Sequence, residues 1–315
     1  MAVTYTLLTI ANQVTAELGL PQLTSIVGNT DLTARQILAL ANRSGDNLYQ
    51  EHQWTPLQNY SIVNIGTPTY IGNAVSVAGS KDLVLSTNAG IVANYYMVTG
   101  VEAPTSARVV AVNVDGVTIT MDEPSQFTGT SAVVVVQDTF SIPNDFKWWL
   151  NRTMWDRTNH WELIGPISPE VDEWQRSGIV SQGPRIRWRQ VGFPDQCWRL
   201  WPPPAAPNTY PLTLVFEYVS DYWCKSASGT PQAAFTADTD VPIVDGQAIV
   251  LDVKWRLWQA KGFNFASYQQ EALDYIARLA ARDGGNPDLY LGRRRGWNDF
   301  LISPWSVQDG SWPTN

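Results

Sequence analysis

Histidine and cysteine, which many metal sites and nucleophilic enzymes depend on, are nearly absent from this 315-residue sequence. It contains two of each: His52, His160, Cys197 and Cys224. The cysteines form no CxxC pair and have no histidine at metal-ligand spacing, so we expect no metal site and no cofactor. Whether the two cysteines form a disulfide is left open, although a chain of this length does not need one.

The shortage of histidine also limits the catalytic devices that the chain could contain. A Ser-His-Asp or Cys-His arrangement would have to use His52 or His160, and neither lies near a nucleophile motif. Carboxylate pairs such as Asp122 with Glu123 occur in turn-like sequence, where solvation or capping is the simpler role. A glycosidase would need two carboxylates about 5–10 Å apart in a cleft, an arrangement that the sequence leaves open. We therefore expect no active site.

Charged residues are scarce, at 16%, and the net charge is -8. Phosphate binding needs clustered Lys and Arg, so this balance argues against a general nucleic-acid binder. The first residues have no basic region and no cleavage site, and no apolar run is long enough to span a membrane. We expect a chain made in a reducing cytoplasm that does not contact membranes.

Tryptophan, in contrast, is abundant, with 15 copies. Trp148, Trp149, Trp155, Trp255 and Trp258 recur at helical spacing beside other apolar residues, which favours a core or a subunit interface. Few charges and many aromatic residues suit a protein that buries surface against partners.

Helical periodicity is strongest at the two ends of the chain. In 244–283, Ala248, Leu251, Trp255 and Trp258 form one apolar stripe, and Ser267 with Gln270 predicts a capping-box start for a second helix. Near the N-terminus, we expect one helix from Thr4 to Leu18 and another from Thr30 or Asp31 to His52. Because these apolar faces need partners, the sequence predicts a helical bundle formed by both chain ends.

Between the two ends, the composition changes at about residue 59 to Val, Ile, Thr, Gly and Ser with few charges. Residues 108–113 and 117–121 alternate around Asp115-Gly116, which predicts a hairpin, and 133–136 reads as a buried strand. Short strands at this spacing predict an inserted small β-barrel or β-sandwich domain over 59–139.

The following segment mixes both patterns. Asn144 is expected to cap a helix that carries Trp148, Trp149, Met154 and Trp155, and a second helical turn is expected over 169–176. Three strands are expected to form a short antiparallel sheet packed on the helices: 185–189, in which Arg185, Arg187 and Arg189 share one face, 198–201 and 210–218.

These expectations define an α+β fold with four regions. They are N-terminal helices (1–58), an inserted β domain (59–139), a short sheet with C-terminal helices that complete the bundle (140–285), and a C-terminal tail (286–315).

The tail has an unusual composition. A cationic cluster, Arg293, Arg294 and Arg295, is followed by large apolar residues without helical periodicity: Trp297, Phe300, Leu301, Ile302 and Trp305. A frayed terminus is the common fate of such segments. Apolar residues at this density are costly to leave in water, so we expect the tail to dock on a partner.

The order of several segments resembles a known family. An N-terminal helix pair and a β insertion are followed by IPNDFKWWLNRTMWD, WRLWPPPAAPNTYPLTLVFEYVS, DTDVPIVDGQAIVLDVKWRLWQAKGFNF and a last helix ending in ARD. This order, over most of residues 1–285, is similar to the head-to-tail adaptors of short-tailed bacteriophages, also called tail tubular protein A.

The resemblance implies a structural virion protein at the head-tail interface, assembled in the host cytoplasm. It implies a homo-oligomeric ring of twelve copies below the portal protein, connected to a tail nozzle like tail tubular protein B, with DNA passing through the channel without specific binding. A C-terminal segment that reaches into the portal is known in this family, which suits the tail residues Arg293, Arg294, Arg295, Trp297, Phe300, Leu301 and Trp305. No motif in the tail carries the resemblance itself.

Two other functions are left open. Exposed Trp side chains stack on sugars, so a receptor- or glycan-binding tail component is the second hypothesis. A tail-associated hydrolase is the third.

Overall fold

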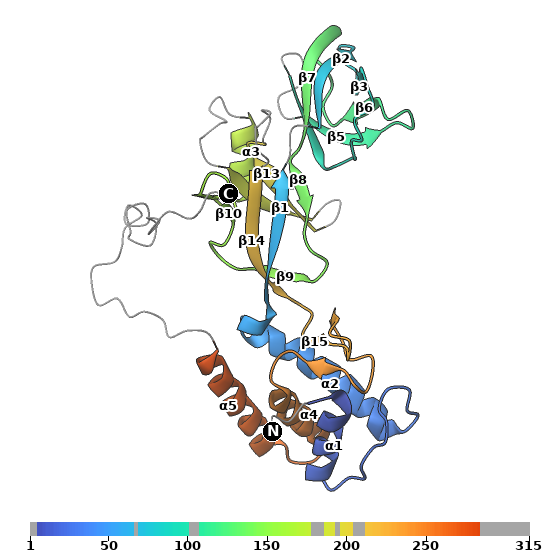
Figure 1. Cartoon of the computed structure of the whole chain (residues 1–315), viewed down its shortest axis with the longest axis vertical. Coiled ribbons are helices and arrows are strands. Elements are labelled where there is room, and N and C mark those ends of the chain that lie inside the picture. Colours follow the sequence, from blue (N-terminus) through green and yellow to red (C-terminus); the bar gives the residue numbers. More distant parts are fainter. Residues whose placement is uncertain are drawn as a thin grey trace, which may run out of the picture.

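The computed structural model describes residues 5–65, 69–100, 107–177, 186–192, 196–203 and 212–283. The fold is α+β, with five α-helices, a closed six-stranded antiparallel barrel and further antiparallel sheets among these residues. Three parts follow one another along the long axis of the molecule: a helical part, a central part made mainly of sheets, and the barrel (Figure 1). No helix among the described residues is long and apolar enough to cross a membrane.

The helical part contains elements from both regions of strong helical periodicity. They are α1 (Leu7–Glu17), α2 (Leu32–Glu51), the short 3-10 helix η1 (Thr55–Leu57), α4 (Gly246–Ala260) and α5 (Ala266–Arg282). Thr6, Asp31 and Asp245 cap the first residues of α1, α2 and α4 through their side-chain oxygens, as such residues do at helix starts. Buried side chains of α1, α2 and α4 share one hydrophobic core, which includes Ile10, Val14, Ile37, Ala41, Leu48, Ile249, Val253 and Leu257.

Polar contacts reinforce the packing of α4 against α1. Lys254 is largely buried in α4, and its Nζ lies 2.7 Å from Oε2 of Glu17 at the end of α1. The hydroxyl of Tyr5 donates to Gln247 Oε1 at 2.9 Å. A charge this well buried needs a partner, so Glu17 is part of what keeps the two helices in register.

The capping box expected at Ser267 and Gln270 is wrong. Phe265 is the N-cap of α5 and makes no side-chain cap bond, while Asn264 Oδ1 accepts from the Ala266 N–H at 3.3 Å. The helix begins earlier because Asn264 satisfies a first-turn N–H from outside the helix.

The central part contains two sheets and α3 (Pro169–Ser177). In the larger sheet, β1 (Gln58–Ile65) pairs with β14 (Leu212–Ser220), which also pairs with β9 (Phe146–Trp149) and β10 (Trp155–Asp156); β11 (Trp161–Glu162) pairs with β10. The smaller sheet has the order β12 (Arg187–Val191), β13 (Cys197–Trp201), β8 (Thr139–Ser141). The two sheets enclose an aromatic core that includes Trp198, Phe216, Tyr218, Phe146 and Trp188.

The helix expected after Asn144 is wrong, since this segment forms strand β9. Trp148 pairs with Val219 and Trp149 with Tyr218, so neighbouring Trp side chains point to opposite faces. Trp148 packs against the helical core, whereas Trp149 contacts Phe146, Phe216 and Trp188 in the central core. Two separate cores therefore require an extended backbone here.

The expected grouping of the three strands is also partly wrong. Strands β12 and β13 pair as expected, but β14 belongs to the larger sheet, and β8 is the third strand of the smaller one. Arg185 lies outside the described residues. Residues 169–176 are helical as expected, in α3.

The barrel covers fewer residues than the inserted domain expected over 59–139. Its strands run from Tyr70 to Gln137, because β1 pairs with β14 and not with a barrel strand. They are β2 (Tyr70–Ser76), β3 (Asp82–Leu85), β4 (Tyr96–Gly100), β5 (Ala107–Val112), β6 (Thr118–Met121) and β7 (Gly129–Gln137), closed in the order β2-β3-β6-β5-β4-β7. The hairpin at Asp115-Gly116 is confirmed as β5–β6. Gly116 has a φ of +66°, in the left-handed region that glycine adopts without steric cost.

The first and last barrel strands are direct neighbours. Tyr70 on β2 lies opposite Val135 on β7, so the chain enters and leaves the barrel at adjacent positions. A core of its own fills the barrel, with Leu83, Val98, Val109, Ile119 and Val133 among its members.

Small strands complete the helical part. Strands β15 (Cys224–Lys225), β16 (Pro231–Gln232) and β17 (Val241–Pro242) form a three-stranded sheet between β14 and α4. Trp223 packs edge-on against Phe235, with the ring centroids 4.7 Å apart, and both residues belong to the helical core.

Candidate functional site

The predicted docking residues Arg293, Arg294, Arg295, Trp297, Phe300, Leu301 and Trp305 lie outside the described residues. The structure does describe the point from which this tail departs. Asp283, the C-cap of α5, accepts from the backbone N–H of Thr55 at 2.7 Å, and its Oδ2 lies 3.3 Å from Nε2 of His52. The root of the tail is thus held at the corner between α2 and η1.

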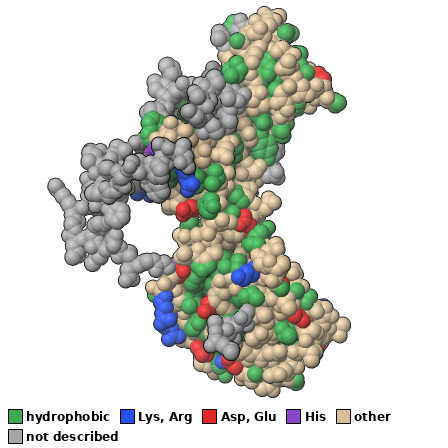
Figure 2. Space-filling view, in the orientation of Figure 1, with side chains coloured by type: hydrophobic (Ala, Val, Ile, Leu, Met, Phe, Trp, Pro, Cys, Tyr) green, Lys and Arg blue, Asp and Glu red, His purple; other side chains and the backbone are tan. Residues whose placement is uncertain are grey.

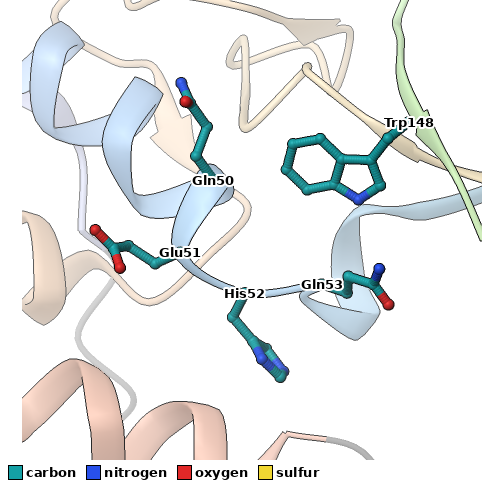
Figure 3. Close-up of a pocket in the computed structure, with 5 residues that line it drawn as sticks. All are labelled: Gln50, Glu51, His52, Gln53 and Trp148. Carbon is teal, nitrogen blue, oxygen red and sulfur yellow. The ribbon is translucent and has the colours of Figure 1, made fainter.

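A shallow hollow of about 450 Å³ lies beside this corner (Figure 3). It is lined by Gln50, Glu51, His52, Gln53 and Trp148. The indole nitrogen of Trp148 is buried and makes no hydrogen bond. Among the described residues, the lining provides one carboxylate, Glu51, and one histidine, His52.

A cluster of ionisable groups lies where the helical and central parts meet. From α2, Asp46 accepts from the Trp223 indole N–H at 3.1 Å, and the ring of Tyr49 lies 5.3 Å below Lys147 Nζ. From the central part, the Tyr218 hydroxyl donates to Asp145 Oδ1 at 2.9 Å. Asp221 lies beside these groups, and its Oδ1 is buried without a hydrogen-bond partner.

The surroundings raise the pKa values of three groups in this cluster: Asp221, Lys147 and Tyr218. Burial, followed by the negative charge of Asp145, raises the pKa of the Asp221 carboxyl, and Lys147 only partly opposes the shift. The hydrogen bond to Tyr49 raises the pKa of Lys147. Burial and the bond to Asp145 raise the pKa of Tyr218. Such clusters occur in active sites, and here the groups also join the helical part to the central part.

A second buried charge joins the barrel to the central part. Asp138 is fully buried, with Arg108 Nη1 at 2.8 Å from its Oδ2 and Arg199 Nε at 3.9 Å. Arg108 comes from the barrel strand β5 and Arg199 from β13, and the Asp138 carbonyl accepts from the Leu200 N–H at 2.8 Å. Asp138 therefore orients the barrel on the central part.

The surface also separates into chemically different regions. Figure 2 shows a barrel surface with few charges, and basic side chains gathered beside α5, where Arg278 and Arg282 are exposed. In α5 only Ala272 is buried, and the side chain of Leu273 is 51% exposed. In the central part, Trp161 and Trp174 are 48% and 66% exposed.

The cysteines and His160, which the sequence offered as possible reactive or metal-binding residues, are not brought together by the fold. Cys197 and Cys224 are both free and buried, in β13 and β15. Burial, followed by the charge of Asp240, raises the pKa of the Cys224 thiol to about 12, so it is not a reactive thiolate. His160 is exposed in the turn between β10 and β11. Within the described residues, no group of three or more His, Cys, Asp or Glu could hold a metal ion.

Sequence reasoning missed both buried charge clusters. Asp138 directly follows an apolar strand and precedes Thr139 and Phe140, and a charge between two buried runs is a usable signal for a buried partner. Asp221 gives no comparable signal, because its partners Asp46 and Asp145 are distant in sequence.

Comparison with protein-family models finds no match, and comparison with curated proteins finds no significant similarity.

Proposed function

We propose that this chain is a structural virion protein, a head-to-tail adaptor that forms a ring below a portal protein. In this proposal it has no catalytic activity. It connects the capsid to a tail nozzle and contributes to the channel through which DNA leaves. The proposed ring has twelve copies, as the family resemblance implies.

The observation that carries this proposal is the exposure of α5. This helix of 17 residues buries only Ala272 completely, while Tyr275, Ile276 and Leu279 are partly buried against the core. We propose that α1, α2, α4 and α5 act as one bundle formed by both chain ends. In this arrangement the outer side of α5 meets a neighbouring copy.

The charges along α5 support such a contact. Glu271 and Asp274 lie in its first half, and Arg278 and Arg282 lie in its second half. A neighbouring copy that is displaced along the helix would bring acidic and basic halves together and keep Leu273 away from water. Exposed pairs of this kind set orientation and contribute little affinity, which suits subunits that assemble only on a template.

The low positive charge of the chain supports passive passage of DNA. Phosphate binding requires clustered cations, and the chain has 21 Lys and Arg against 29 Asp and Glu. An acidic channel wall would repel the duplex and keep it sliding.

The test is electron microscopy and mass photometry of the purified protein with and without its portal. We expect monomers in dilute solution and rings of twelve copies on the portal. Leu273→Asp should prevent ring formation without loss of the fold. Leu32→Asp is a matched control, since Leu32 is 78% exposed at the start of α2. If both variants assemble on the portal like the parent, the α5 interface is wrong; if no ring forms at all, the adaptor function is wrong.

Exposed tryptophans favour one second candidate, a glycan-binding tail component. Trp174 and Trp161 are the most exposed tryptophans among the described residues. Titration with host surface polysaccharide should then quench Trp fluorescence in the parent and not in Trp174→Ala. Absence of quenching in the parent would remove this candidate.

A further inference from the structure

Strand β1 is an edge strand without the usual protection against pairing. It pairs with β14 over its full length, from Gln58 opposite Val219 to Ile65 opposite Leu212, and no described strand lies on its other side. Natural edge strands are usually short, bulged, or interrupted by charges or proline. Strand β1 has eight residues, QNYSIVNI, with none of these features.

The bonding of β14 shows which backbone groups of β1 are free. Glu217 lies opposite Tyr60, but its N–H donates to Thr153 Oγ1 and its carbonyl accepts from the Leu150 N–H. Thr213, opposite Asn64, likewise bonds to Thr158 and Arg157. Because bonded and non-bonded pairs alternate, the backbone groups of Tyr60, Ile62 and Asn64 point away from β14.

These three residues are also exposed through their side chains. Tyr60 is 62% exposed and Ile62 is 47% exposed. The Tyr60 N–H is covered by Asn59 Oδ1 at 2.9 Å. The N–H and C=O groups of Ile62 and Asn64 have no partner among the described residues. Apolar side chains and free backbone groups at one edge are what an added strand requires.

The root of the tail lies at the beginning of this strand. Asp283, the last described residue, is bound to the Thr55 N–H, three residues before β1 begins. The residues 284–299 span at most about 55 Å when extended, which is twice the length of β1, about 26 Å. The tail can therefore run past β1 and return beside it.

One segment of the tail matches the edge in chemistry. The segment Phe300-Leu301-Ile302-Ser303 is uncharged and mainly apolar, includes two residue types enriched in strands, Phe300 and Ile302, and is followed by Pro304. Strand β1 is also uncharged, so pairing would not desolvate an unpaired charge.

We propose that the free edge of β1 binds this chain's own C-terminal segment, residues 300–303, as an added strand. The contact is intramolecular, and the position of Asp283 favours it by keeping the segment at high effective concentration. It does not depend on the adaptor function. If the tail also docks on a portal, release from β1 is the step that makes it available.

Hydrogen exchange of the full chain tests this pairing at single amides. The Ile62 and Asn64 amides should exchange at least tenfold more slowly in the parent than in the double variant Phe300→Ser with Ile302→Ser. Ser61 and Val63, which bond to β14, should be equally protected in both. Trp312→Ser, in the same tail and outside the segment, is the matched control and should leave all four rates unchanged.

The source of the strand is tested by oxidising the double variant Ile62→Cys with Leu301→Cys. A cross-link within one monomer supports the proposal. Cross-linked dimers, which would mean strand exchange between copies, overturn it, as does the absence of any cross-link. Equal exchange of Ile62 and Asn64 in the parent and in the double Ser variant overturns it as well, whatever the portal experiments show.

Discussion

Single residues determine how the barrel is attached. Asp138 is completely buried between arginines from β5 and β13. Asp138→Ala should lower the free energy of unfolding by about 3–5 kcal/mol, because removing one partner leaves buried positive charge without compensation. Denaturant unfolding followed by circular dichroism measures this loss.

The control for Asp138 is an exposed ion pair. Arg152, whose side chain is 63% exposed, lies 3.4 Å from Glu162. Arg152→Gln should change the free energy of unfolding by less than about 1 kcal/mol. Equal effects of the two variants would contradict the role assigned to Asp138.

At Gly45 in α2, replacement by Ala should change stability in the direction opposite to the one that helix propensity predicts. In an ordinary helix, Gly→Ala stabilises by about 1 kcal/mol. At Gly45 a Cβ would lie 2.3 Å from Cζ2 of Trp223, whose ring is buried and held by Asp46. Gly45→Ala should therefore destabilise by about 1–3 kcal/mol. Arg43→Ala, on the exposed side of α2, should be nearly neutral, and a stabilised Gly45→Ala would show that Trp223 moves freely.

Asp221 should make stability depend on pH in a defined direction. Burial and Asp145 raise its pKa in the folded state. Its contribution to stability is therefore complete below the unfolded-state pKa and is lost as the pH rises through the raised value. Asp221→Asn should raise the Tm at pH 7, and the difference from the parent should shrink towards pH 4.

Asp115 is a control for Asp221, because its pKa is lowered in the folded state and its effect on the pH dependence of stability has the opposite sign. Hydrogen bonds from the backbone of Thr118 and Val117 lower its pKa, so its contribution is present at neutral pH and is lost as the pH falls. Asp115→Asn should lower the Tm at pH 7. Parallel Tm curves for the parent and Asp221→Asn across this range would refute the assignment.

Hydrophobic periodicity predicted the helices that pack into a single core. It predicted the wrong secondary structure where neighbouring side chains pack into two different cores. The apolar stripes of α2 and α4 could be recognised in the sequence because both helices pack into one core, α4 with nearly all of its sides between Ala248 and Lys254. In 146–149, Trp148 and Trp149 serve different cores, which only a strand allows. The pairing of β14 with β1 could not be predicted from the sequence, since the paired residues lie between 147 (Ile65 and Leu212) and 161 (Gln58 and Val219) positions apart.

The barrel should be removable as a unit. Its first and last strands are neighbours and it has its own core, so replacing 66–137 with a short Gly-Ser linker leaves β1 and Asp138 in place. Asp138 would then reach water, and its charge would no longer need Arg108. The remaining chain should keep a cooperative helical melt in circular dichroism. Loss of that melt would mean that the barrel is part of the structural core.

For the whole molecule, the candidate portal-docking site lies in the C-terminal tail, residues 286–315, and amino-acid composition is the signal that identifies it. Its cationic cluster and aromatic residues are visible in the sequence because they break the pattern of a weakly charged, acidic chain. The structure adds where the tail begins, at Asp283, a position that sequence spacing does not predict, because Thr55 and His52 are distant in the chain.

Truncation after Gly292 should therefore remove portal binding while the protein stays folded. We expect portal binding to be abolished, because Arg293–Arg295 and the aromatic anchors are lost together. The Tm should fall only slightly, since every described element is retained and only the strand proposed to add to β1 is lost. Binding measured by interferometry at the same affinity as the parent would mean that the tail is only a terminus.

The long ladder between β1 and β14 also determines how the molecule bears force. Strand β1 leads from the helical part towards the barrel and runs antiparallel to β14 over eight residue pairs (Figure 1). Tension applied between the helices and the barrel is carried by the backbone of β1 itself. Any movement of β1 relative to β14 loads their hydrogen bonds in shear, so these bonds must break together and do not open one at a time. Forced unfolding is governed by the unfolding rate. The link between the two ends should thus be mechanically strong while the small sheet β15–β17 yields first.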